Sequence, residues 1–322
     1  MLDTESTMRA ISPAAWGGPE VLREVTLARP APGPTEILVR VHAAGVNPID
    51  WKTRATGGFG MHGEPPVLGY DVSGVVEAVG PGVTLHRPGD EVFGMPEFPR
   101  QAGGYAEYVT GPARHFVPKP AVLGHVEAAA LPLAGLTAWQ SLVETAGLVS
   151  GQRVLIHAAA GGVGHLAVQI AAARGAHVIG TAREEKHALL RGLGAHELVD
   201  YTRQDFAEVL GNQDVDVVLD SIGGDYGHRS LRVLRDGGTL LTLPSPDEVP
   251  VPDGGVPRGI RTGFTLVEPD STGMRALASL AADGRLRPVV ETVLPLERAA
   301  DAHRLGETGR TRGKIVLTVA DV

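Results

Sequence analysis

The segment from Val154 to Gly180 most constrains what this chain can fold into. It runs from an apolar stretch through Gly161-Gly162-Val163-Gly164 into a helix-like pattern and then into a second apolar stretch. Parallel strands need a crossover connection, and a helix whose apolar face packs on the sheet is the usual one. The segment therefore predicts a strand, a helix and a second strand parallel to the first.

The glycine turn matches the dinucleotide-binding fingerprint, with Ala159 at the first glycine position and Gly161 and Gly164 at the others. No Ser, Thr, Asp or Asn caps the following helix, so an anion would satisfy its first N–H groups. We therefore expect the turn to bind a pyrophosphate. The alternative is a glycine-rich turn that only tightens the connection. The residues expected at the pyrophosphate are Ala160, Gly161, Gly162, Val163 and Gly164.

The end of the second strand indicates which nucleotide binds. An acidic residue there binds a ribose 2′-OH, whereas a basic residue binds a 2′-phosphate. This strand ends in Thr181-Ala182-Arg183, with Lys186 one turn later. Arg183 at a helix start opposes the helix macrodipole, a cost that a bound phosphate would reverse. These residues favour NADPH over NADH. In the alternative interpretation, the two glutamates after Arg183 neutralise it and the segment is a solvated helix end.

The spacing of apolar residues, Gly and Pro divides the chain into three parts. Residues 1–123 are broken by Gly and Pro into short β-branched stretches, which predicts a β-rich, barrel-like domain. Residues 124–258 alternate apolar stretches with amphipathic helices, including one over 226–238, and predict a doubly wound α/β domain. Residues 259–322 are expected to complete that sheet and then to form a strand, a helix and a strand.

Composition argues against several kinds of partner. The net charge is −8 and no basic run occurs, whereas nucleic acid is bound by clustered Lys and Arg. The absence of cysteine rules out disulfides and thiolate metal sites. The N-terminus is acidic where a signal peptide is basic, and no apolar run approaches the roughly 18 residues that span a bilayer. We expect a cytoplasmic protein that binds neither nucleic acid nor membrane.

Five segments carry a resemblance to a known family: GVNPIDWKTR, LGYDVSGVVEAVG, LPLAGLTAWQSL, AAAGGVGHLAVQIA and GRTRGKIVLTV. From about Met8 to Val319 the chain resembles the zinc-free quinone oxidoreductase and alkenal/enone reductase branch of the medium-chain dehydrogenase/reductase superfamily. The resemblance implies a GroES-like β-rich catalytic domain to which the C-terminal segment returns, and a Rossmann doubly wound parallel sheet between. It also implies NADPH in the cleft and often a homodimer.

The zinc-ligand positions of the superfamily are altered in this chain. Where its zinc alcohol dehydrogenases carry a Cys ligand this chain has Asn47, and where they carry Gly-His-Glu it has Gly69-Tyr70-Asp71. None of the twelve histidines has an H-x-H or HExxH spacing. We therefore expect no metal, and no alcohol oxidation by Lewis-acid zinc.

The resemblance also suggests catalytic residues. Hydride transfer to a quinone, or to the β-carbon of an enone, leaves negative charge on the conjugated oxygen, and hydrogen-bond donors must stabilise it in place of zinc. The NPIDWK segment is expected beside the nicotinamide, which makes Asn47 and Lys52 candidates for contact with cofactor and substrate. Tyr70, in the former ligand position, is the third candidate. The alternatives are an exposed lysine at a strand end and a packed tyrosine.

Further cofactor contacts follow from matching the motifs of the resembled family. Strand ends are where an open α/β sheet binds ligands. For the last two residues of the set, the alternative is a charged turn before an edge strand. The set comprises Thr137, Tyr201, Ser221, Leu243, Arg312 and Lys314.

Three functions are compatible with these features. The first is an NADPH-dependent, metal-free reductase of quinones or of the activated double bond of enones and alkenals. The second is an enoyl-thioester reductase of a biosynthetic pathway, and the third a non-catalytic, NADPH-binding redox sensor, because a fold does not by itself fix a function.

Overall fold

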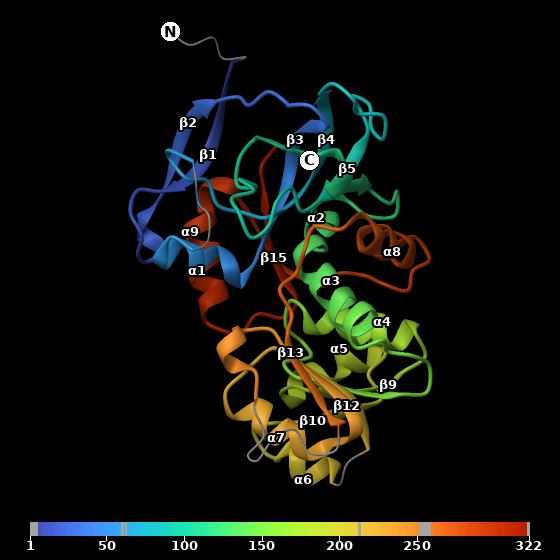
Figure 1. Cartoon of the computed structure of the whole chain (residues 1–322). Helices are drawn as coiled ribbons and strands as arrows, with labels where there is room; N and C mark the ends of the chain where they lie inside the picture. The colour runs from blue at the N-terminus through green and yellow to red at the C-terminus, as the bar shows by residue number, and fades with distance from the viewer. Residues whose placement is uncertain (1–5, 59–60, 62, 212–213, 251–258, 321–322) are drawn as a thin grey trace. The chain divides into compact units, whose positions relative to one another are not determined.

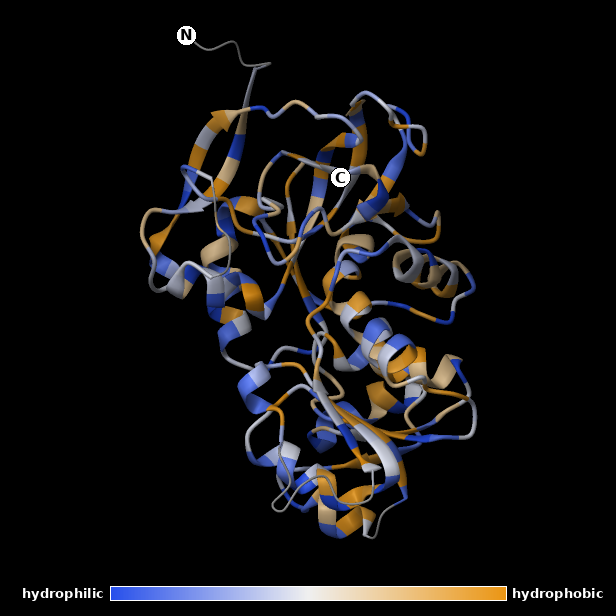
Figure 2. Cartoon of the chain, viewed as in Figure 1, coloured by the Kyte–Doolittle hydropathy of each residue, from blue (hydrophilic) through white to orange (hydrophobic). Residues whose placement is uncertain are grey.

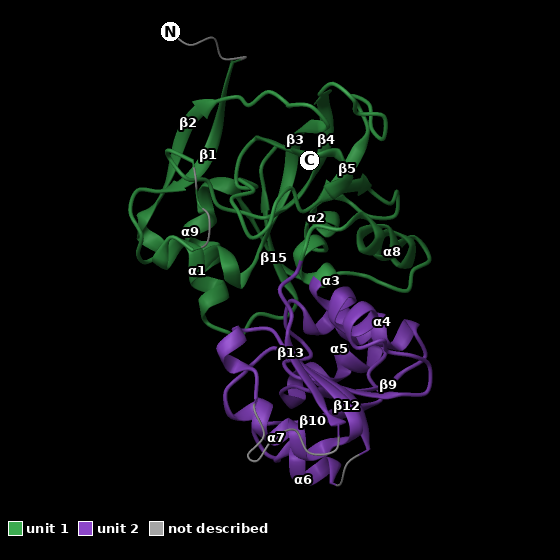
Figure 3. Cartoon of the chain, in the orientation of Figure 1, with its two compact units in different colours: residues 1–136, 268–322 green, residues 137–267 purple. Residues whose placement is uncertain are grey.

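The computed structural model describes residues 6–58, 61, 63–211, 214–250 and 259–320. The chain separates into two compact units (Figure 3). Unit 1 is formed by Met1–Leu136 with Glu268–Val322, and unit 2 by Thr137–Val267. The domain boundaries at 123/124 and 258/259 stay predictions, because compactness alone does not define a part of the chain that folds by itself.

Unit 1 is built on a seven-stranded sheet whose main order is 14-15-3-4-5-7 in strand numbers, with strand 6 also paired to strand 3. Its strands are β3 (Glu36–Val46), β4 (Asp71–Val79), β5 (Glu91–Gly94), β6 (Tyr108–Pro112), β7 (Phe116–Pro118), β14 (Val290–Pro295) and β15 (Lys314–Thr318). In Figure 1, the red β15 lies beside the blue β3, and the two strands pair antiparallel with Ile315 opposite Val46. The C-terminal segment therefore returns to the sheet of the N-terminal part.

The remaining elements of unit 1 cover this sheet. A core of buried side chains that includes Val39, Val41, Phe116 and Leu317 holds the strands and helices together. The elements are a hairpin of β1 (Thr7–Pro13) and β2 (Leu22–Ala28), helices α1 (Pro48–Thr56), α2 (His125–Ala129), α8 (Ser271–Ala282) and α9 (Ala299–Glu307), and short turns η2 (Pro19–Val21), η3 (Ala113–His115) and η8 (Leu296–Arg298). The β-rich character expected of this part is confirmed.

The described residues of unit 2 form a six-stranded sheet in which every pair is parallel. Its strands are β8 (Arg153–Ile156), β9 (His177–Thr181), β10 (Glu197–Val199), β11 (Val215–Asp220), β12 (Leu234–Thr242) and β13 (Arg261–Phe264). The order β10-β9-β8-β11-β12-β13 is that of the doubly wound dinucleotide fold, so the predicted fold class is confirmed. The order reverses between β8 and β11, which is where such sheets bind ligands.

The helices of unit 2 connect these strands. Buried apolar side chains of β8, β9, β11 and β12 form the core of this unit, and Figure 2 shows orange apolar segments in its sheet beside white and blue ones. The elements are α3 (Pro132–Trp139), which begins in unit 1 and continues into the π-helical turn η4 (Gln140–Thr145), then α4 (Gly164–Ala173), η5 (Glu184–Lys186), α5 (His187–Gly192), α6 (Phe206–Leu210), α7 (Asp225–Val233) and η6 (Pro246–Glu248).

The helix predicted over 226–238 is wrong in its second half. Helix α7 ends at Val233, because Leu234 already has extended backbone angles of −68° and 136° and begins β12. The Arg-Asp-Gly-Gly segment that follows Leu234, exposed in its first three residues, has the composition of a helix C-terminus, which favours Gly and basic residues. Leu234 and Thr239, on either side of this segment, pair with Val215 and Val217 of β11, so the segment is an irregularity within β12 and not the end of a helix.

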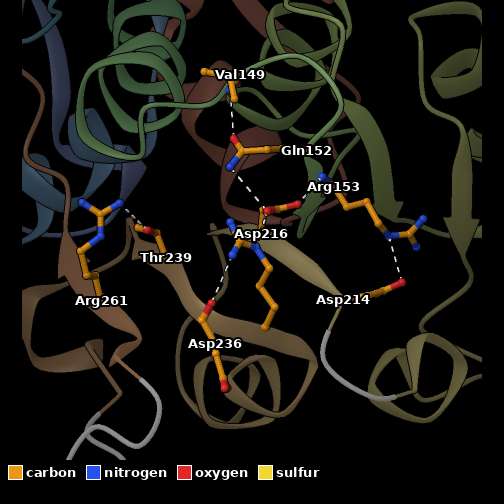
Figure 4. Close-up of polar contacts among 9 residues, drawn as sticks. Val149, Gln152, Arg153, Asp214, Asp216, Asp236, Thr239 and Arg261 are labelled. Carbon is orange, nitrogen blue, oxygen red and sulfur yellow. Dashed lines mark hydrogen bonds and ion pairs between the residues drawn. The ribbon is translucent and has the colours of Figure 1, made fainter.

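The amino edge of this sheet is held by Asp216 of β11 (Figure 4). Its carboxylate accepts hydrogen bonds from the backbone N–H of Arg153 over 2.7 Å and from the side chain of Gln152 over 3.5 Å. The Nε of Arg235, in β12, also donates to it. One side chain thus ties the starts of β8 and β12 to β11, at the edge opposite the strand ends expected to bind ligand.

Candidate functional site

The glycine turn of unit 2 follows β8 at the carboxyl edge of the sheet. Ala158 has a positive φ of 48°, and its carbonyl oxygen accepts a hydrogen bond of 2.8 Å from the N–H of Gly161. A Cβ atom at Gly164 would overlap that carbonyl oxygen and the backbone of Ala159. Helix α4 packs this closely on the strand only because residue 164 is glycine.

The start of α4 presents backbone donors without acceptors. Within the described part of the chain, the N–H groups of Gly162, Val163 and Gly164 make no hydrogen bond. No side chain among the described residues caps this helix, whereas Asp270 caps α8 through two backbone N–H groups. Three neighbouring donors at the positive end of a helix dipole form a cradle for an anion. This geometry fits a pyrophosphate.

His157 directly precedes this turn and holds the end of β8 in place. Its Nδ1 lies 3.2 Å from the hydroxyl of Thr181, and its Nε2 lies 2.8 Å from the hydroxyl of Ser230. Burial lowers the pKa of His157 to about 3, so the ring is neutral and one nitrogen donates while the other accepts. The residue ties β8 to β9 and α7. Its partners lie far away in the sequence, so no local signal identifies it.

A pocket of about 440 Å³ lies at the carboxyl ends of β9 and β10. The guanidinium Nε of Arg183 donates to the hydroxyl of Tyr201 over 3.2 Å. This hydrogen bond raises the pKa of Arg183, which stays positively charged. Two residues predicted to bind the cofactor are thus in direct contact here. The pocket is lined by Arg183, Glu184, Glu185, Asp200, Thr202 and Arg203.

The acidic residues of this pocket have other partners. Glu184 forms its ion pair with Arg203, at 2.6 Å, and not with Arg183. Hydrogen bonds from Thr202 lower the pKa of Asp200, which is therefore ionised. Besides the hydrogen bond to Tyr201, the charges of Glu185 and Asp200 raise the pKa of Arg183, so the alternative in which a neighbouring glutamate neutralises Arg183 remains for Glu185. Arg203 was missed from the sequence, although a basic residue two positions after Tyr201 was a visible signal.

Most of the other cofactor residues predicted in unit 2 lie at the same carboxyl edge. The N–H of Leu243 donates to the carbonyl oxygen of Asp220 over 2.9 Å, which holds the end of β12 against β11. Lys186 is half-buried in η5, and Thr137 is buried in α3. The residues at the strand ends themselves are Thr181, Ala182, Ser221 and Leu243.

Unit 1 contains a buried polar cluster formed by Asn47, Asp71 and Lys314. The amide Nδ2 of Asn47 donates to Oδ2 of Asp71 over 2.9 Å, and the ammonium of Lys314 donates to Oδ1 of Asn47. The ammonium also lies 3.3 Å from Oδ2 of Asp71. The other carboxylate oxygen of Asp71 accepts from the backbone N–H of Leu133 over 2.7 Å. This cluster joins the ends of β3, β4 and β15.

Helix α1 begins directly at this cluster. Asn47 precedes it as N-cap, and its backbone N–H donates to Oδ2 of Asp50 over 2.7 Å. The hydroxyl of Tyr105 donates to the same oxygen over 3.1 Å. Burial raises the pKa of Asp50 to about 7. Lys52 lies further along α1 and is exposed, so of the catalytic candidates it alone presents its side chain to solvent.

The two remaining predicted residues of unit 1 differ in their surroundings. Tyr70 is buried, stacks edge-on against Phe98, and donates to the carbonyl oxygen of Pro99 over 3.4 Å. Burial raises the pKa of Tyr70 to about 12, which makes it a poor proton donor near neutral pH. Arg312 is exposed, and its backbone N–H donates to Glu291 over 2.9 Å.

Comparison with known proteins gives consistent similarities. Residues 33–121 match the family described as alcohol dehydrogenase GroES-like domain, and residues 193–317 the family described as zinc-binding dehydrogenase. The chain is 34% identical over 335 residues to a quinone oxidoreductase of Sus scrofa, covering 98% of this chain and 99% of that protein.

Two further similarities are of the same kind. A 2-methylene-furan-3-one reductase of Solanum lycopersicum is 35% identical over 329 residues, which cover 97% of this chain and 79% of that protein. The solved structure of the quinone oxidoreductase from Coxiella burnetii superposes with a TM-score of 0.88 at 36% identity, covering 98% of this chain and 100% of that one.

Proposed function

Since the chain belongs to the quinone oxidoreductase and enone reductase branch of the medium-chain dehydrogenase/reductase superfamily, we propose that it is an NADPH-dependent reductase of quinones or of the activated double bond of enones and alkenals. Relatives named NAD(P)H oxidoreductase and quinone oxidoreductase support a nicotinamide-dependent oxidoreductase activity for this chain. The preference for NADPH and the kind of acceptor are the parts that we propose.

The observation that carries the preference for NADPH is the pocket beside Arg183. Its guanidinium is held by the hydroxyl of Tyr201, and the residue that follows it, Glu184, forms an ion pair with Arg203. A 2′-phosphate in this pocket would contact the guanidinium of Arg183 directly. It would reach the guanidinium of Arg203 by replacing Glu184 in the ion pair. Charge-assisted hydrogen bonds of this kind are the strong ones.

The donors at the start of α4 would bind the diphosphate of the same cofactor. The N–H groups of Gly162, Val163 and Gly164 need an acceptor, and the Ala158 turn and the side chain of His157 fix their direction. When bound, NADPH supplies a hydride. The role of unit 2 is to hold the cofactor without side-chain charges close to the diphosphate.

Lys52 is the residue that we assign to the acceptor. Reduction of a quinone or enone by hydride places negative charge on the conjugated oxygen, and an ammonium group stabilises that charge. Asn47 is buried, and both its amide NH₂ and its amide oxygen already have hydrogen-bond partners. Its role is therefore to position the start of α1. Tyr70 stays protonated and packed. Water supplies the proton that completes the reduction.

We also propose that the reaction needs no zinc. Among Asn47, Tyr70 and Asp71, only the carboxylate of Asp71 is a usual zinc ligand, and both of its oxygens already accept hydrogen bonds. The ammonium of Lys314 lies against this carboxylate as its counter-charge. Over the described residues, no group of three or more His, Asp or Glu side chains is arranged to hold a metal ion. The residues present do not fit zinc.

The experiment is NADPH oxidation followed by absorbance, with a quinone, a short enone, an alkenal and an enoyl thioester as acceptors. We expect turnover with a quinone or with a free enone or alkenal. Faster turnover of the thioester would instead indicate a biosynthetic enoyl reductase. NADPH binding without turnover of any acceptor would indicate a redox sensor, and absence of NADPH binding would contradict both.

A further inference from the structure

Lys314 is a buried lysine with a defined set of partners. It is the first residue of β15 and only 3% exposed, and its ammonium donates to Oδ1 of Asn47 and lies 3.3 Å from Asp71. Both partners are themselves at most 1% exposed. A buried charge is tolerated only with a counter-charge and hydrogen bonds, and this one has both.

These contacts fix the orientation of the Asn47 side chain. Its carbonyl oxygen faces the ammonium and its NH₂ group faces the carboxylate of Asp71, so the amide is held between a cation and an anion. Asp71 is in turn held by the backbone N–H of Leu133. The amide therefore has one orientation, and removal of the ammonium would release its oxygen.

The orientation of Asn47 matters because this residue starts α1. Its own N–H is held by Asp50, and on the body of the helix Arg54 bonds to the carbonyl oxygen of Gly17 and to Nδ1 of His303. The side chain of Arg54 also forms an ion pair with Glu307. The first turn of α1 is thus fixed by β15 and the body by α9, with exposed Lys52 between them.

We propose that Lys314 is a positioning residue for the reduction. It fixes the start of α1 through Asn47, and thereby the placement of Lys52, and it makes no contact with the cofactor. This inference rests on the proposed function, and it replaces the cofactor contact that the family resemblance suggested for Lys314. Lys314 is separated from Asn47 by 267 residues in the sequence.

The competing role for Lys314 is simple neutralisation of Asp71. Two variants separate the roles. K314R keeps the positive charge but replaces a compact ammonium with a larger planar group, which displaces the Asn47 amide. K314M/D71N removes both charges of the pair together, so neither is left buried without its partner. If neutralisation is the whole role, both variants retain the kcat of the unmodified chain.

Positioning predicts that both variants lower kcat about tenfold or more while the Kd for NADPH stays within about twofold, because small displacements near reacting groups have large effects on rate. The control is K119M. Lys119 is also in unit 1, its side chain is only 5% exposed, and its ammonium contacts Glu91 and the carbonyl oxygen of Leu123. We expect K119M to leave kcat unchanged.

A double-mutant cycle tests whether Lys314 acts through Lys52. In a K52M background, K314R should cost less than about twofold in kcat, because the residue that it positions is gone. Equal losses with and without Lys52 would overturn the proposal. So would a kcat within about twofold of the unmodified chain in both Lys314 variants, or a tenfold weaker Kd for NADPH at unchanged kcat.

A measurement independent of activity comes from the two asparagines of the chain, Asn47 and Asn212. With ¹⁵N-labelled asparagine, the Asn47 side-chain NH₂ signals should shift in K314R and stay in place in K119M. Unshifted signals in K314R would overturn the proposal that Lys314 orients the Asn47 amide, even if the protein reduces no acceptor. Absence of turnover in the unmodified chain, with the NH₂ shift present, would refute the proposed function alone.

Discussion

At the scale of single residues, neighbours in one motif have different tasks. Asn47, Asp50 and Lys52 lie within six positions of each other, yet the first two are buried and the third is exposed. The family resemblance predicted that this segment lies beside the nicotinamide. It did not separate the roles, because the partners of Asn47 come from β4 and β15, and those of Asp50 include Tyr105.

Arg183 tests the nucleotide preference. We expect R183A to weaken NADPH binding about 10- to 100-fold and NADH binding less than threefold, because only NADPH loses a charge-assisted hydrogen bond to its 2′-phosphate. Calorimetric titration with both nucleotides measures this. R191A, which removes an exposed arginine of α5 outside the pocket, is the control and should change neither Kd. Equal losses for both nucleotides would remove Arg183 from the 2′-phosphate.

Asp50 makes stability depend on pH. Burial raises its pKa to about 7 from an ordinary value of 3.8. Between these values the unfolded chain loses a proton that the folded chain keeps, so stability falls as pH rises from about 4 to about 7 and is then level. The cost at neutral pH is ~4 kcal/mol at about 1.4 kcal/mol for each tenfold change in proton affinity.

The variant D50N lacks this titration. Its stability relative to the unmodified chain should therefore increase between pH 4 and pH 7, as measured by urea unfolding at several pH values. The Tyr105 hydroxyl and the N–H of Asn47 keep an acceptor in the amide oxygen. Stability curves that run parallel across this range would show that Asp50 is ionised normally in the folded chain.

At the scale of elements, the turn before α4 depends on backbone geometry. A methyl group at Gly164 would overlap the carbonyl oxygen of Ala158, so G164A should move the turn and weaken NADPH and NADH alike. We expect a loss of tenfold or more in both, together with about 1–3 kcal/mol of stability. G192A in α5, where a Cβ would meet no atom within 4 Å, is the control. Unchanged affinities in G164A would exclude the turn from the diphosphate site.

The opposite edge of the same sheet should matter for stability alone. D216A leaves the N–H of Arg153 (Figure 4) and the Nε of Arg235 without their acceptor. We expect about 2 kcal/mol of lost stability in urea unfolding, with the Kd for NADPH within about twofold. A large loss of affinity without a loss of stability would show that this edge communicates with the nucleotide site.

The order of elements in unit 2 was predictable because apolar residues recur at different spacings in its strands and its helices. Apolar runs separated by amphipathic stretches predicted the parallel sheet, whereas the Leu234 to Gly238 segment was assigned to the wrong element. Contacts between distant residues were not predictable. His157 with Ser230, and Asn47 with Lys314, depend on how the sheets bring their strand ends together.

At the scale of the whole molecule, the C-terminal segment folds back onto the sheet formed by the N-terminal part of the chain. Strand β15 pairs with β3, so unit 1 is completed only when the last part of the chain is present. The family resemblance implied this return, and periodicity alone did not. No helix among the described residues is both long and apolar enough to cross a bilayer. The homodimer expected from the resemblance stays a prediction, which light scattering of the purified chain will test.

The central claim is that this chain reduces its acceptor with NADPH and without metal. The direct measurement is NADPH oxidation by protein that has been treated with a chelator and analysed for zinc, with a quinone and an enone as acceptors. The account predicts undiminished turnover at zinc contents far below one atom per chain, and no stimulation by added zinc. Loss of turnover on chelation that zinc restores, or failure to bind either nicotinamide dinucleotide, would contradict it.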